Sequence, residues 1–199
     1  MSPETNEKEN YPWYTLVEPT STFKQGDIVK ACPLIDPSSI LEGKGEKTVN
    51  YYESDSIILS QSCDLEHGHL EIVLVSPLYP LEEFKIDKPY YKSSDGKEEL
   101  RRRYLPGYFL LNECNITGFI SKFRVVDFHN VYGIPFNYIT RLAKTQGQRL
   151  RLLPPYRESL AQEFAKFFAR VGYPVDIPEF ATKKTASIAG TLTKPWKKC

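Results

Sequence analysis

Short apolar runs broken by Pro and Gly dominate the hydrophobic pattern of the chain. Residues 57–59 (I-I-L) and 72–75 (I-V-L-V) are rich in β-branched side chains and too short for a helix. Residues 28–29 follow a Gly-Asp turn, residues 105–111 begin with a Pro-Gly turn, and residues 119–128 alternate apolar with polar positions. The pattern predicts about six strands packed as a small β-barrel or sandwich.

A helical period is clear in one segment, residues 155–171. Two prolines stand at its start, where a missing N–H is tolerated, and Gly172 follows its end. Its apolar positions fall on one stripe, at Leu160, Phe164, Phe167, Phe168 and Val171. We expect an amphipathic helix that covers one face or end of the sheet. Shorter helical segments are predicted at residues 81–86 and 95–103, the second with Asp95 as its cap.

The length of 199 residues fits one hydrophobic core. We expect disordered residues 1–10, a single domain over residues 11–180 with a charged insertion at 80–104, and a basic flexible tail at 181–199. No run approaches the roughly 18–20 apolar residues of a membrane-spanning helix, and the polar N-terminus is unlike a signal peptide. The sequence therefore predicts a cytoplasmic protein with no membrane association, and no cofactor is predicted.

The net charge of +1 conceals two oppositely charged halves. Residues 1–100 hold 9 Lys and Arg against 19 Asp and Glu, whereas residues 101–199 hold 17 against 6. One interpretation is a phosphate-rich partner, such as a nucleic acid, bound by the basic half. The other is that the two halves fold against each other and disperse their charges.

Reactive side chains gather between the two central apolar runs, in residues 60–69 (S-Q-S-C-D-L-E-H-G-H). One interpretation takes Cys63 as a thiolate nucleophile, with a histidine as its base and an aspartate to orient that base. The candidates for these two roles are His129 or His67 and Asp127 or Asp64. The D-x-H spacing of the Asp127 and His129 pair puts both on one face of a strand.

The same loop holds a C-x-x-x-H-x-H spacing, which offers three zinc ligands. These would be Cys63, His67 and His69, with Cys32 or Cys114 as a fourth. The spacing does not recur in structural zinc sites, so we predict no metal site. The four cysteines form no C-x-x-C pair and no disulfide framework, and we expect free thiols.

Two non-catalytic interpretations of the loop stay open. In one, Ser62, Cys63 and Asp64 build a tight turn, with Cys63 as a small buried apolar residue. In the other, the loop recognises a partner through polar side chains such as Ser62 and His67.

A second candidate binding segment combines cations with aromatic rings. Arg101, Arg102 and Arg103 stand directly before Tyr104, and Tyr108 follows. Such a combination is suited to stacking on single-stranded bases, and it is equally suited to packing. We treat these five residues as a candidate nucleic-acid contact.

Four motifs follow one another in a characteristic order. They are G-D-I-V at residues 26–29, I-L-S at 58–60, V-S-P-L at 75–78 and V-V-D at 125–127, and a helix comes after them. In this order they resemble the MazF/PemK family of toxin endoribonucleases, whose members are small SH3-like barrels. The resemblance covers residues 23–171 and implies an SH3-like barrel closed by a C-terminal amphipathic helix.

Two departures from the family bear on activity. Its ribonucleases have an R-P pair entering the second long strand, where this chain has Ser54 and Asp55. They have Thr or Ser after the P-L pair, where this chain has Tyr79 and Pro80. Cleavage of a phosphodiester needs a cation against the developing negative charge and a positioned proton donor. The resemblance therefore implies a divergent member whose activity is lost or relocated.

We predict a non-catalytic or catalytically degenerate binding protein, regulatory in a bacterial stress or defence system of the toxin–antitoxin type. Its partner would be a protein, or RNA bound by the basic half, and a homodimer is a further expectation. One enzymatic alternative is an endoribonuclease that uses residues 101–103 with Asp64, His67 or His129. Another is a cysteine-dependent enzyme centred on Cys63. The candidate catalytic residues are thus Cys63, Asp64 and His129.

Overall fold

A computed structural model describes residues 11–35, 50–68, 70–104 and 106–169. Within these residues the chain forms eight strands and five α-helices, so the fold is mixed α/β. The strands are β1 (Tyr14–Val17), β2 (Asp27–Ile35), β3 (Tyr51–Ile58), β4 (Ile72–Pro80), β5 (Tyr108–Leu111), β6 (Arg124–Asp127), β7 (Tyr132–Pro135) and β8 (Arg149–Leu152). The helices are α2 (Ser62–Glu66), α3 (Leu81–Asp87), the 3₁₀ helix η1 (Pro89–Lys92), α4 (Ser94–Arg102), α5 (Phe136–Gln146) and α6 (Tyr156–Phe168).

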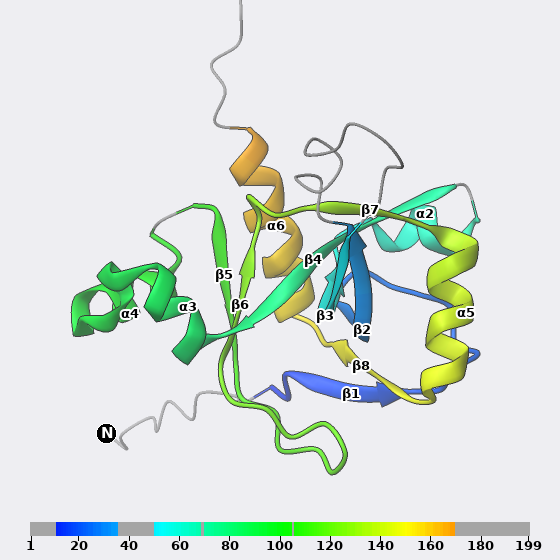
Figure 1. Ribbon diagram of the computed structural model, residues 1–199, viewed down its shortest axis with the longest axis horizontal. Coiled ribbons are helices and arrows are strands. Elements are labelled where there is room, and N and C mark those ends of the chain that lie inside the picture. The colour runs from blue at the N-terminus through cyan, green and yellow to red at the C-terminus, as the bar shows by residue number, and fades with distance from the viewer. Residues whose placement is uncertain (1–10, 36–49, 69, 105, 170–199) are drawn as a thin grey trace, which may run out of the picture.

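All strands pair antiparallel, in the order β1-β8-β2-β3-β4-β6-β5, and β7 pairs with β4 beside this path (Figure 1). Within the described residues the end strands β1 and β5 do not pair with each other, so the sheet is not closed there. The predicted β-rich body with helices is confirmed, whereas the closed SH3-like barrel is not.

Strand β4 organises the sheet because both of its edges are paired. Residues 75–77 pair with β3. On the other edge, residues 72–75 pair with β7 and residues 78–80 pair with β6. Backbone N–H and C=O groups need partners once they are buried, and pairing on two edges supplies them along most of the strand. The rest of the sheet therefore takes its register from β4.

The two ladders on that second edge do not join smoothly. Leu78 follows Val75 by three positions in β4. Their partners, Val126 and Tyr132, are six positions apart in the chain. The connection between β6 and β7 must therefore leave the sheet at this point. Pro77, which has no N–H to donate, lies in the stretch of β4 that neither ladder uses, so its presence in a central strand costs no ladder bond there.

A β-bulge interrupts the pairing of β2 with β3. The register shifts between Val29 and Cys32, and Ala31 inside the bulge has φ of 40°. The Ala31 N–H donates to Asp55 Oδ1 at 3.1 Å, so a side chain of β3 satisfies a backbone group that the ladder has lost. The bulge changes the direction in which the side chains on either side of it point.

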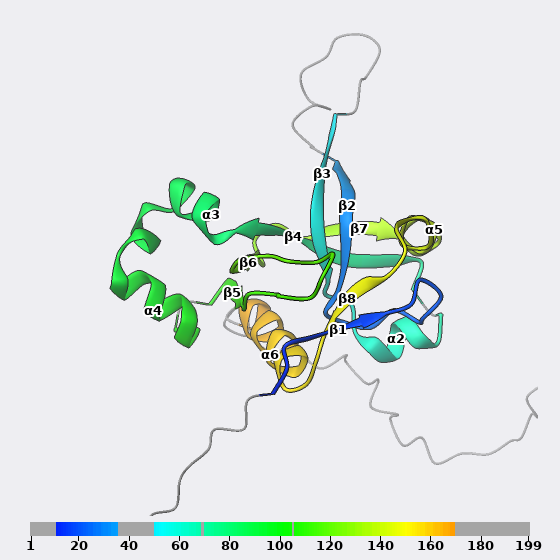
Figure 2. The same cartoon turned by 90° about the horizontal axis from the view of Figure 1, so that it is seen from below.

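Three groups of buried side chains lie between the sheet and its helices. Leu160 of α6 packs with Phe109 and Phe128, and Ile139 of α5 packs with side chains of β2 and β4. The third group, under α3, η1 and α4, is formed by Phe84, Tyr91, Leu100 and Val125. Figures 1 and 2 show α5 at one end of the sheet and the segment from α3 to α4 at the other.

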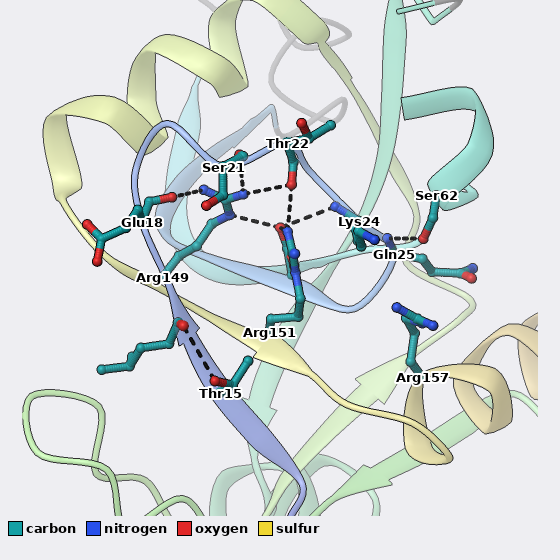
Figure 3. A network of polar contacts seen from close by, with 12 residues as sticks. Thr15, Glu18, Ser21, Thr22, Lys24, Gln25, Ser62, Arg149, Arg151 and Arg157 are labelled. Atoms are coloured by element: carbon teal, nitrogen blue, oxygen red, sulfur yellow. Dashed lines mark hydrogen bonds and ion pairs between the residues drawn. The ribbon is translucent and has the colours of Figure 1, made fainter. Parts of the chain in front are cut away.

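A buried carboxylate fixes the N-terminal part of the fold. Asp27 Oδ2 accepts from Arg149 Nε at 2.8 Å, and Asp27 Oδ1 accepts from Arg151 Nε at 2.6 Å. Both arginines also donate to backbone carbonyls of residues 18–22, which wrap around them (Figure 3). Asp27 is fully buried and Arg149 nearly so, and the pairing satisfies charges that would otherwise be costly to bury.

Several predicted elements differ in extent from those observed. The helix expected at 155–171 is α6, and the strand expected at 119–128 is confined to β6. Asp95 is not the cap of α4: Ser93 is, because its side chain accepts from the N–H of Gly96. The segments predicted to be disordered or flexible, residues 1–10 and 181–199, lie outside the described residues. Among the described helices, none has the length and apolar character needed to cross a membrane.

We predict that Asp27→Asn lowers the free energy of unfolding by about 3 kcal/mol or more, because it leaves two buried guanidinium groups without their counter-charge. Urea unfolding followed by circular dichroism measures this. Glu158→Gln, which breaks the exposed Arg157–Glu158 pair, is the matched control and should cost less than about 1 kcal/mol. Equal losses in the two variants would contradict the assigned role of Asp27.

Candidate functional site

The predicted reactive loop forms a short helix, α2, between β3 and β4. Ser62, Cys63 and Asp64 lie in its first turn, and His67 caps its end with Nδ1 placed 2.6 Å from the Cys63 carbonyl oxygen. Cys63 is exposed. The tight-turn interpretation is therefore wrong in two respects, since the segment is helical and Cys63 is not a buried apolar residue.

The serines of this loop hold backbone rather than a ligand. Ser60 Oγ accepts from the N–H of Leu74 at 2.8 Å, and Ser62 Oγ accepts from the N–H of Gln25 at 3.1 Å (Figure 3). An ion pair of 3.0 Å between Lys24 and Glu66 ties α2 to the same neighbouring segment. These contacts give the loop a structural function that sequence spacing alone did not reveal.

The version of the predicted thiol site that uses His129 as its base is not assembled. Cys63 Sγ contacts Gln61 Oε1 at 3.9 Å and Asp64 Oδ1 at 3.7 Å, and no contact among the described residues joins it to His129. The described residues also contain no group of three His, Cys, Asp or Glu side chains close enough to hold a metal ion. His69, one of the zinc ligands considered above, lies outside the described residues.

A second group, built around Asp127, occupies the connection between β6 and β7 that leaves the sheet. His129 Nδ1 lies 2.6 Å from Asp127 Oδ1, which also accepts from the His129 backbone N–H at 2.9 Å. Asn130 Nδ2 donates to Asp127 Oδ2 at 3.0 Å, and Ser76 Oγ donates to the Asp127 carbonyl oxygen at 3.0 Å. Asp127 and His129 are therefore in contact, but they do not share one face of a strand as predicted, because β6 ends at Asp127 and His129 lies in the connection that follows. Ser76 of β4 anchors the Asp127 end of the pair.

The His129 ring is fixed by packing as well as by Asp127. Tyr108 and Phe167 flank it, with ring centroids 5.2 and 4.7 Å away. Gly107 passes so close that a Cβ there would lie 2.5 Å from His129 Cε1. The Asp127 side chain is 8% exposed and that of His129 is 48% exposed, so a carboxylate holds a half-exposed imidazole in one orientation. Such a pair can hold or move a proton at Nε2.

Tyrosine hydroxyls continue this polar group toward β3 and β7. Burial raises the pKa of Tyr79 and of Tyr108, and the negative charge of Asp127 adds to the rise. Tyr52 and Tyr132 share a hydrogen bond of 2.9 Å between their hydroxyls. Burial also raises the pKa of Tyr52, so Tyr52, Tyr79 and Tyr108 stay protonated at neutral pH and act as neutral hydrogen-bonding groups.

In the part of the chain that the structure describes, no cation is paired with Asp127 or His129. Within the described residues, the hydrogen bonds and ion pairs of Asp127 and His129 involve no Lys or Arg. Stabilising the negative charge of a phosphodiester transition state needs such a group. Among the described contacts, the geometry thus supplies an acid–base pair without a cation paired to it.

The predicted Arg-Tyr segment lies at the end of α4 and does not converge on His129 as a unit. Arg101 and Arg102 both pair with Glu98, and the hydrogen bonds from Arg101 and then Arg102 lower the pKa of that carboxyl to about 2. The Arg103 guanidinium lies 4.7 Å from the centre of the Phe109 ring. Tyr104 is 64% exposed, and of the predicted binding residues only Tyr108 joins His129.

An apolar groove of about 540 Å³ lies between β2, β3, β7 and α5. Tyrosine, proline and aliphatic side chains line it, and Glu53 is its one ionisable lining residue apart from tyrosine phenols. Its main contributors are Ile35, Tyr51, Tyr132, Pro135, Tyr138 and Leu142. The groove could not be predicted from the sequence because β7 and α5 were not predicted.

No protein-family model matches the chain, and no curated protein matches it either. The MazF/PemK resemblance therefore stays a prediction based on the motifs.

We predict that Gly107→Ala displaces the His129 ring and destabilises the fold. A methyl group there overlaps the imidazole, in addition to the strain of φ 114°. Gly118→Ala is the matched control, because Gly118 has φ of 82° and no atom near its Cβ position, leaving backbone strain of about 1 kcal/mol. Thermal unfolding and the NMR signals of the His129 ring measure the effect. Unchanged ring signals in Gly107→Ala would contradict the packing described.

Proposed function

We propose that the chain is a catalytically degenerate binding protein with an SH3-like, MazF/PemK-like body, and that its partner is a protein. The observation that carries the proposal is the apolar, tyrosine-rich groove between β7 and α5. Tyrosine and aliphatic side chains without surrounding cations are typical of surfaces that bind proteins, whereas nucleic acids need Lys and Arg. A role in a bacterial stress or defence system is what the resemblance adds.

The dispersal of the predicted catalytic residues supports a role without catalysis. Cys63 and Asp64 lie on α2, and His129 lies on the connection between β6 and β7. Where the family's nucleases have Arg and Pro, this chain has Ser54 and Asp55, and the Asp55 carboxylate accepts from the backbone N–H of Ala31. A carboxylate there supplies no positive charge against the developing negative charge of a phosphodiester transition state.

The side chains that line the groove indicate which kind of partner segment would bind there. An apolar segment of a partner protein, carrying a Lys or Arg opposite the exposed Glu53, complements both the lining and its one fixed charge. Such a segment would cover Ile35 and Tyr51, which are 53% and 65% exposed. Burying these side chains on binding provides a hydrophobic contribution to affinity.

We predict that p-benzoylphenylalanine in place of Tyr138 forms a discrete protein adduct on irradiation in bacterial cells that produce the chain. Tyr138 lines the groove and is 38% exposed, so the substitution preserves an aromatic ring in contact with the partner. The same photo-reactive residue in place of Ile86, which is 67% exposed on α3, is the control for surface labelling and should give no matching adduct.

A charge reversal makes this test specific. Glu53→Lys should reduce the adduct about tenfold or more by placing like charges in contact. Glu83→Lys, on the exposed surface of α3, should leave it unchanged. An adduct that nuclease removes, no protein adduct, or equal yields from both variants would contradict the proposed groove partner.

The Asp127–His129 pair favours a second candidate, an endoribonuclease with His129 as its proton-transfer group. The first proposal predicts that purified wild-type protein cleaves RNA no faster than a mock preparation from cells lacking the chain. Gel analysis of a labelled RNA pool measures this. Cleavage that His129→Ala abolishes and that Cys63→Ser retains would instead establish the second candidate and contradict the absence of catalysis.

A further inference from the structure

A polar pocket of about 220 Å³ opens beside the bulge of β2, and the functions considered above do not use it. Lys30 of the bulge, Asp55 of β3 and Arg124 of β6 line it, together with Ser121 from the segment that precedes β6. The remaining lining residues are apolar or glycine, so the pocket contains two cationic side chains and one carboxylate.

Arg124 is buried without enough partners. The residue is 8% exposed, and its ion pair among the described residues is a 3.5 Å contact from NH1 to Asp55 Oδ2. Its Nε and NH2 atoms have no hydrogen bond of ordinary geometry among the described residues, although the Tyr14 hydroxyl lies close enough to the guanidinium to interact with it. A buried guanidinium with unmet donors is costly, which indicates that something outside the described chain satisfies them.

Two further donors line the same space. Ser121 Oγ is buried and has no hydrogen-bond partner among the described residues, although its backbone is held by two 2.9 Å bonds to Cys114. Lys30 Nζ donates to the Gly118 carbonyl oxygen at 3.0 Å and lies 3.9 Å from the centre of the Phe119 ring. Both contacts position the ammonium group at the edge of the pocket.

We propose that this pocket binds a phosphate group. The Nε and NH2 atoms form one edge of a guanidinium, and that edge matches two oxygen atoms of an oxyanion. Ser121 and Lys30 add donors from other directions, which suits a tetrahedral anion with more than two oxygens better than a carboxylate. The Asp55 carboxylate can accept a hydrogen bond from the P–OH group of monohydrogen phosphate, a donor that sulfate lacks at neutral pH.

The phosphate can come from inorganic phosphate or from a phosphoryl group on a larger molecule, because the contacts described here address only its oxygens. The site does not depend on the proposed protein partner, whose groove has a different lining. Failure of one proposal therefore leaves the other intact.

The test is calorimetric titration of the full chain with sodium phosphate at fixed ionic strength, with sulfate, acetate and a nucleoside monophosphate as parallel ligands. We expect saturable binding of phosphate, and weaker binding of sulfate and acetate. Nucleoside monophosphate that binds more tightly than inorganic phosphate would assign the group to an organic phosphate, and equal or weaker binding would assign it to free phosphate. Both results support the site.

Single substitutions distinguish phosphate binding in this pocket from non-specific anion binding elsewhere on the surface. Lys30→Gln and Ser121→Ala should each weaken phosphate binding about tenfold, by removing one donor. Lys122→Gln should bind as the wild type does, because Lys122 is 85% exposed and pairs with Glu113. These variants keep the test valid even if Arg124→Gln fails to fold. No saturable phosphate binding, equal or tighter binding of sulfate or acetate, or wild-type affinity in both pocket variants would overturn the proposal.

Discussion

Pairing of strand β4 along both of its edges is the constraint on which the rest of the structure depends. Strand β3 occupies one edge, and β7 and β6 share the other. The two ladders on the shared edge are out of step, so the connection between β6 and β7 leaves the sheet and carries His129 outward. Ser76 of β4 donates to the Asp127 carbonyl oxygen at the base of this connection, which anchors the acid–base pair to the strand.

The two faces of β6 carry different kinds of side chain. Successive side chains of a strand point to opposite faces, so Arg124 and Asp127 lie on different sides of the sheet. Asp127 meets His129 and the tyrosines, while Arg124 enters the polar pocket beside the β2 bulge. Arg124 and the Asp127–His129 pair are thereby kept apart in space, although only three positions separate Arg124 from Asp127 in the chain.

Short-range sequence patterns predicted the elements that depend mainly on neighbouring residues. The β-branched run at 72–75 lies in β4, and that at 57–59 covers the end of β3. The Asp127–His129 spacing predicted two residues on one face of a strand, whereas the structure brings them together through the turn after β6. Strand β8 was missed because Arg149 and Arg151 interrupt its apolar pattern, and their burial depends on Asp27, more than 120 residues earlier. The pocket at Arg124 was missed for a similar reason: it needs a bulge in β2 and a side chain of β3 that only the folded chain brings together.

Native-state hydrogen exchange of the backbone amides tests the central claim, that β4 sets the register of the sheet and hence the position of each candidate site. The account predicts that amides of Val73 and Val75 exchange only through global unfolding. Amides of the end strands β1 and β5, which pair along one edge, should exchange faster through local opening. Exchange of the β4 amides at the rate of β1 or β5 would contradict the account.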